Sequence, residues 1–102
     1  MNAVLLDKMS GLKDLCEKYY VLRLELFGSA AKGEFIPGKS DLDFLVEFRR
    51  TEAMNVADQY FGLLEDLKKL FDCNVDLVMK KAMRNPYFIR SVNQTSVPLY
   101  AA

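Results

Sequence analysis

Two short segments decide the fold: residues 26–33, which read LFGSAAKG, and residues 40–43, which read SDLD. In the first segment an alternating apolar run stops at a glycine. A strand that ends in Gly28-Ser29 at the start of a helical turn presents backbone N–H groups to an anion. Gly28 lets a phosphate approach the backbone because it has no side chain, and the Ser29 hydroxyl can donate a hydrogen bond to a phosphate oxygen. The segment therefore predicts a phosphate-binding turn.

The second segment places two carboxylates on one face of a strand. Residues 41–48 alternate, so Asp41 and Asp43 project from the same face, close to each other. Two like charges held this close repel and raise each other's pKa. Mg²⁺ removes that penalty, because it prefers oxygen ligands and usually takes one or two carboxylates plus substrate phosphates. The pair predicts a Mg²⁺ clamp next to the turn.

A third carboxylate, Asp76, lies within a later strand-like run, residues 74–80. The apolar residues of this run share the inward face and leave Asp76 on the other. If this strand lies beside residues 41–48, Asp76 joins Asp41 and Asp43 on one face. It would then bind a second metal ion or take the proton of an attacking hydroxyl. A strand aspartate that simply faces solvent is the plainer alternative.

The rest of the pattern alternates between helical and strand periods. The expected elements are helices over residues 4–19, 53–71 and 86–93, and strands over residues 21–27, 41–48 and 74–80. Thr51 is the expected cap of the second helix, whereas Asn85 and Pro86 form a typical start for the third. Residues 97–100 are expected to pack back on the body. The prediction is an α+β (α/β) fold, in which a small mixed sheet of three or more strands is flanked by helices and residues 1–102 form one domain.

The composition excludes several classes of function. Fourteen basic and fourteen acidic residues balance, which leaves no strong nucleic-acid footprint. No stretch approaches the roughly twenty apolar residues of a membrane span, and no signal pattern opens the chain. Cys16 and Cys73 match no zinc spacing and are expected to be buried free thiols in a reducing cytoplasm. Because histidine is absent, a general base must be a carboxylate, a lysine or a tyrosine.

The combination of Gly28-Ser29, residues 40–43 and Asp76 on a later strand resembles the polymerase-β-type nucleotidyltransferase superfamily, in particular its minimal nucleotidyltransferase (MNT) branch. The resemblance covers nearly the whole chain. It implies transfer of AMP from ATP to a hydroxyl, with two Mg²⁺ ions assisting. In members that act as antitoxins, it implies a tyrosine of a HEPN-type toxin as the acceptor. The residues that it implies are Asp41, Asp43 and Asp76 as catalytic metal ligands, and Gly28, Ser29, Lys32 and Ser40 as nucleotide-binding groups.

Two departures from the family pattern bear on activity. Ala30 stands where many members carry a basic residue, and the spacing from Ser29 to Asp41 is one residue longer than usual. Three functions therefore stay open: an enzyme that modifies a partner protein, an antitoxin that neutralises its toxin by contact alone, and a subunit of a small-molecule nucleotidyltransferase. A homo- or hetero-oligomer is compatible with each.

Two basic clusters and several tyrosines have plainer interpretations. Arg49-Arg50 and Lys80-Lys81, the latter with Arg84 nearby, could contact phosphates or an acidic partner. Solvated surface is the more usual role of such charge runs. The tyrosines, Tyr60 among them, are expected to pack in the core or at its rim.

Overall fold

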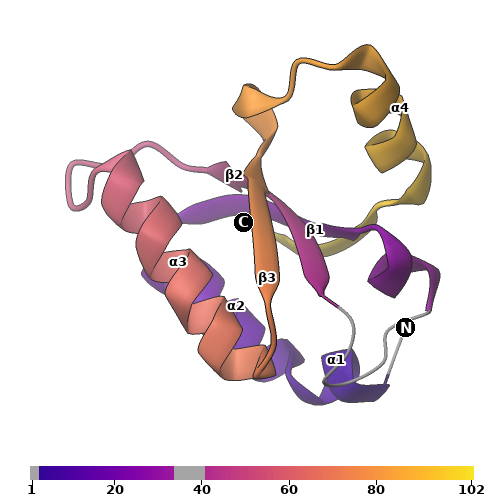
Figure 1. The fold of residues 1–102 in the computed structure, drawn as a ribbon. Helices are drawn as coiled ribbons and strands as arrows, with labels where there is room; N and C mark the ends of the chain where they lie inside the picture. The colour runs from indigo at the N-terminus through magenta and orange to yellow at the C-terminus, as the bar shows by residue number, and fades with distance from the viewer. Residues whose placement is uncertain (1–2, 34–40) are drawn as a thin grey trace.

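A four-stranded sheet in the order β3-β2-β1-β4 lies at the centre of the fold (Figure 1). The structure is a computed structural model that describes residues 3–33 and 41–102. The strands are β1 (Val21–Phe27), β2 (Leu42–Phe48), β3 (Val75–Met79) and β4 (Val97–Ala101). β1 is antiparallel to β2 and β4, whereas β2 and β3 are parallel. Helix α3 (Val56–Phe71) makes the crossover between the parallel pair. The mixed sheet with flanking helices confirms the predicted fold class.

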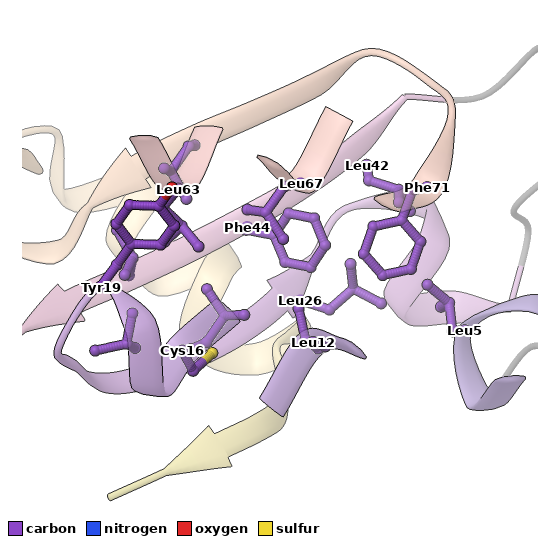
Figure 2. Close-up of a cluster of buried hydrophobic side chains, with 14 of the residues drawn as sticks. Leu5, Leu12, Cys16, Tyr19, Leu26, Leu42, Phe44, Leu63, Leu67 and Phe71 are labelled. Carbon is purple, nitrogen blue, oxygen red and sulfur yellow. The ribbon is translucent and has the colours of Figure 1, made fainter. Parts of the chain in front are cut away.

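The main hydrophobic core lies between one face of the sheet and the helices α2 (Met9–Lys18) and α3. The sheet side is supplied with the period of two by Leu24 and Leu26 of β1 and by Leu42, Phe44 and Val46 of β2. Val21, rather than Leu22, joins them because the register of β1 shifts between Val21 and Arg23. Figure 2 shows core residues from both layers in contact. They include Leu12, Cys16, Leu26, Phe44, Leu63 and Leu67, all fully buried. This core fixes the strands against the crossover helix.

Helix α4 (Pro86–Thr95) covers part of the opposite face of the sheet. Val92 of α4 packs with Phe27 and Leu45 in a second, smaller buried cluster. Asn85 caps α4 as predicted, because its Oδ1 accepts hydrogen bonds from the amides of Tyr87 and Phe88 at 2.9 and 3.3 Å. The helix ends at Thr95, two residues beyond its predicted end.

The N-terminal helix is broken, contrary to the prediction of one helix over residues 4–19. It consists of α1 (Ala3–Asp7) and α2, separated at Lys8. The Lys8 amide bonds to the carbonyl of Leu5 at 3.2 Å, which is the tighter spacing of a turn. The turn changes the chain direction, and Leu5 is buried in the main core.

Helix α3 begins three residues later than predicted, and Thr51 does not cap it. The cap is Asn55, whose Oδ1 accepts from the amide of Asp58 at 2.8 Å. The Thr51 hydroxyl oxygen instead accepts from the amide of Ala53 at 3.1 Å, in the turn before the helix. Both residue types cap helices well, so the sequence alone does not separate them.

The fourth strand is a finding of the structure. The sequence predicts only that residues 97–100 pack back on the body, but they pair with β1 at the edge of the sheet. Pro98 lacks an amide hydrogen, and an edge strand is where such a residue is tolerated. The sheet therefore has one more strand than the three that the sequence marks.

Both cysteines are free thiols, as predicted, although only Cys16 is fully buried. Burial raises the pKa of the Cys16 thiol to about 12, so this group is inert at neutral pH. Within residues 3–33 and 41–102, no helix is both long and apolar enough to cross a bilayer.

Candidate active site

Asp43 and Asp76 lie opposite each other on the two parallel strands. Each is the second residue of its strand, so both lie at the same end of the sheet. Because paired residues of neighbouring strands project from the same face, their carboxylates share the face opposite the main core. The sequence predicts that Asp76 joins the other aspartates if its strand lies beside β2, and β3 does pair with β2.

Asp41 lies at the same end of the sheet, just before β2 begins, and its side chain is exposed. The Leu42 amide donates to the carbonyl of Asn74 at 3.1 Å, which continues the pairing to the residue before β3. The pKa of Asp43 is raised first by partial burial, then by the charge of Asp76, then by that of Asp41. Both neighbouring carboxylates therefore act electrostatically on Asp43.

The absence of a side chain at Gly28 leaves space for the carboxylate of Asp43. The Gly28 backbone has φ 74° and ψ −155°, a conformation essentially restricted to glycine. A Cβ built on Gly28 would overlap Oδ2 of Asp43. The glycine therefore leaves room for a carboxylate of this chain, whereas the sequence predicts only room for a phosphate. The sequence carries no signal of this second role, because the contact joins segments that are distant in the chain.

A short 3₁₀ helix, η1 (Ser29–Lys32), follows Gly28, as the predicted helical turn. The Ala31 amide donates to the Gly28 carbonyl at 3.2 Å. Among the described residues, no backbone carbonyl accepts from the amides of Ser29 or Ala30. Within residues 3–33 and 41–102 these two donors thus have no backbone partner, as the phosphate-binding prediction requires.

Position 30 does not face the phosphate-binding surface. Ala30 is only 3% exposed and packs in the main core. A basic residue is therefore replaced here by a core residue, and Lys32, exposed at the end of η1, is the cation that remains. Ser40, the fourth predicted nucleotide-binding residue, lies outside the described residues.

The three predicted metal ligands are not arranged as a complete metal-binding site. Within residues 3–33 and 41–102, no three acidic, histidine or cysteine side chains are arranged to hold a metal ion. What the fold brings together is the facing pair Asp43 and Asp76, with Asp41 near enough to affect the Asp43 pKa. Two carboxylates fit Mg²⁺, because substrate phosphates and water normally complete its coordination.

Tyr60 is a supporting residue for which the sequence predicts packing alone. Its hydroxyl donates to the Leu77 carbonyl at 2.7 Å. Leu77 follows Asp76 on β3, which is an edge strand. The bond ties the exposed edge of β3 to α3, next to the carboxylate. The sequence holds no sign of it, because an apolar helix position indicates burial but not a hydrogen-bond partner.

Substituting Tyr60→Phe is expected to lower the free energy of unfolding by about 1 kcal/mol, the usual value of one hydrogen bond. It should also increase amide exchange in residues 75–79. Tyr19→Phe is a matched control, since it removes the 2.5 Å hydrogen bond from Tyr19 to Asp66 and leaves β3 untouched. Urea unfolding and hydrogen-exchange mass spectrometry measure the two effects. Equal exchange of β3 in both variants would contradict the role given to Tyr60.

Comparison with known proteins agrees with this geometry. The nucleotidyltransferase domain family matches residues 8–97. The chain belongs to this family. The nucleotidyltransferase is 39% identical over 82 residues to MJ1379 of Methanocaldococcus jannaschii, named as a candidate protein adenylyltransferase, and the match covers 80% of each chain.

Solved structures confirm the fold of the nucleotidyltransferase. The structure of a candidate minimal nucleotidyltransferase superposes with a TM-score of 0.74 at 29% identity, covering 92% of this chain and 91% of that one. A structure of the tri-AMPylated Shewanella oneidensis HEPN toxin with its MNT antitoxin gives a TM-score of 0.65 at 18% identity. That match covers 95% of this chain and 72% of that one and concerns the fold alone. The resemblance to minimal nucleotidyltransferases and the predicted enzyme class are confirmed.

Proposed function

We propose that this nucleotidyltransferase transfers AMP from ATP to a hydroxyl, most simply a tyrosine, of a HEPN-type toxin, and so acts as its antitoxin. The observation that carries the proposal is the facing pair Asp43 and Asp76, with Asp43 in contact with Gly28 at the predicted phosphate-binding turn. The name of MJ1379 supports protein adenylylation, and the S. oneidensis complex supports a HEPN-type partner.

In this proposal, different residues bind the phosphates and the metal ion. The turn at Gly28 and Ser29 binds the phosphates, for which the amides of Ser29 and Ala30 are donors, and Lys32 adds a positive charge. Asp43 and Asp76, with Asp41 beside them, would hold Mg²⁺, which when bound would screen the triphosphate and acidify the acceptor hydroxyl. Burial is the first cause of the raised Asp43 pKa, and the repulsion from Asp76 and Asp41 adds to it. That repulsion would favour uptake of a cation at this point.

The chemical step is a displacement at the α-phosphate. The acceptor oxygen attacks the α-phosphorus, the bond from this phosphorus to the α–β bridging oxygen breaks, and pyrophosphate leaves. Asp76, the more exposed member of the facing pair, accepts the proton of the acceptor hydroxyl. The protein contributes mainly position and charge, as in other phosphoryl-type transfers.

A second candidate is an antitoxin that binds its toxin without turnover. Ala30 favours it, because many members of the family carry a basic residue after the serine and this chain has a buried alanine there. The charge-coupled aspartates favour the enzyme, because such a repulsive group is costly to keep without a cation to bind.

The test combines the chain with α-³²P-labelled ATP, Mg²⁺ and a HEPN-type partner protein. We expect label on the partner, reduced at least about 100-fold by Asp76→Asn. Asp14→Asn is the control, because it removes an exposed carboxylate from α2. Neutralisation of the partner by Asp76→Asn without label would support the antitoxin that acts by contact. Label on a small molecule instead would support the third function left open by the sequence.

A further inference from the structure

A groove of about 410 Å³ lies at the end of the sheet opposite the aspartates, where β2 ends and α3 begins. It adjoins a hollow of about 120 Å³ beside the end of β3, and the two share Phe48, Val56 and Lys81. We call them together the basic groove. In Figure 1 the loop from β2 to α3 lies at the end of α3 remote from the start of β3.

The basic groove combines an apolar lining with positive charge. Its cations are Arg49, Arg50, Lys80 and Lys81, so the fold joins two basic clusters that the sequence shows separately. Within the described part of the chain, none of the four forms an ion pair. Among the described residues of the lining, Glu47 is the one carboxylate. Positive charge therefore exceeds negative charge around this groove.

The apolar part of the lining is open to solvent. Val56, at the first turn of α3, is 54% exposed, and Phe48, Met54 and Met79 are half-buried beside it. Arg49 is held by the ring of Tyr20, whose centroid lies 5.6 Å from its guanidinium carbon. An apolar lining with arginine at its rim is the composition of energetically important sites in protein interfaces.

We propose that the basic groove binds an acidic segment of a partner protein that places an apolar side chain against Phe48 and Val56. Charge complementarity selects the acidic segment, and the apolar lining favours a protein over a nucleic acid. A nucleic acid would need a basic surface that continues along the molecule, whereas these cations gather at one end of a chain with zero net charge.

The basic groove is separate from the aspartate pair. Phe48 lies five positions after Asp43 on the extended strand, or roughly 16 Å away. A segment in the groove and a nucleotide at the aspartates can therefore be bound at once. The inference does not depend on the proposed transfer reaction, because binding in the groove needs neither ATP nor a metal ion.

The test uses a fluorescein-labelled peptide of six glutamates around a central phenylalanine and measures its anisotropy with the full chain. We expect saturable binding that weakens with salt. The double variant Arg50→Glu/Lys81→Glu should weaken it at least about tenfold, since two attractions become repulsions. Lys13→Glu/Arg90→Glu is the matched control, because it makes the same charge change at exposed positions on α2 and α4. Circular dichroism melting checks that both variants fold.

A second arm tests the apolar contact. Val56→Ser, and separately a peptide with serine in place of phenylalanine, should each weaken binding several-fold. Equal losses in the groove variant and the control would overturn the proposal, as would absence of binding. A twelve-nucleotide single strand that binds more tightly than the peptide and is lost in the groove variant would assign the groove to nucleic acid instead. Self-association that the groove variant abolishes would assign it to a second copy.

Discussion

Asp43→Asn is expected to abolish AMP transfer while making the metal-free protein more stable. Asparagine keeps the shape of the side chain but removes the charge that a Mg²⁺–nucleotide would require, so transfer should fall by about 1000-fold or more. The pKa of Asp43 is raised by burial and by Asp76 and Asp41, which means that its ionised form is disfavoured in the fold. Removing that charge should raise the free energy of unfolding by about 0.5 kcal/mol, the scale of substitutions at partly exposed sites.

The stability gain should depend on pH in a defined direction. Because folding raises the Asp43 pKa, the folded protein holds this proton more tightly than the unfolded chain. Stability therefore falls as pH rises from the ordinary carboxyl pKa through the raised one. Urea unfolding with EDTA present can be followed from about pH 3.5 to 7. The free energy of unfolding of Asp43→Asn should increase relative to that of the native protein as pH rises. Asp14→Asn should follow the native protein, and a constant difference across this range would contradict the assigned cause.

Gly28→Ala is expected to lose both stability and transfer. Alanine at this backbone conformation is strained, and its Cβ would overlap the Asp43 carboxylate. The cost to the free energy of unfolding should be about 2–3 kcal/mol. Displacing Asp43 should also lower transfer at least about 100-fold, because small misplacements of a reacting geometry have large kinetic effects. The two losses are measured by urea unfolding and by the labelling assay.

Gly33→Ala separates the strain of the backbone from the overlap with the carboxylate. Gly33 also has a positive φ, 82°, but among the described residues nothing lies within 4 Å of the place that a methyl group would take. This variant should lose only the roughly 1–2 kcal/mol of left-handed alanine and keep its transfer activity. If Gly33→Ala reduced transfer as much as Gly28→Ala, the role given to Gly28, which is to leave space for the Asp43 carboxylate, would be wrong.

The parts of the site that follow from local pattern could be predicted from the sequence. The alternation around Asp43 and Asp76 places each on the outward face of its strand, and Gly28-Ser29 marks the turn. The register that sets Asp43 opposite Asp76 is a property of the parallel pairing. From the sequence, Asp76 could be placed beside Asp43 only on the assumption that the two strands are neighbours, because no local signal determines which strands pair.

The elements that sequence reasoning misplaces share one cause. Thr51 and Asn55 are both good caps, so the start of α3 depends on which side chain reaches the helix amides. Residues 97–100 are strand-like but carry Pro98, and only the free edge of β1 gives them a partner. The Tyr60 bond to Leu77 likewise joins two elements. Each outcome is decided by tertiary contacts that local propensity does not encode.

The parallel pairing of β2 and β3 also couples folding to ligand binding. Asp43 and Asp76 come from opposite ends of the α3 crossover, so the unfolded chain has no equivalent site and a Mg²⁺–nucleotide can bind only the native state. Saturating ligand therefore shifts the folding equilibrium by mass action, by about 2.7 kcal/mol at roughly one hundred times its dissociation constant. If the proposed function holds, the thermal midpoint of the chain should accordingly rise with the concentration of ATP when Mg²⁺ is present.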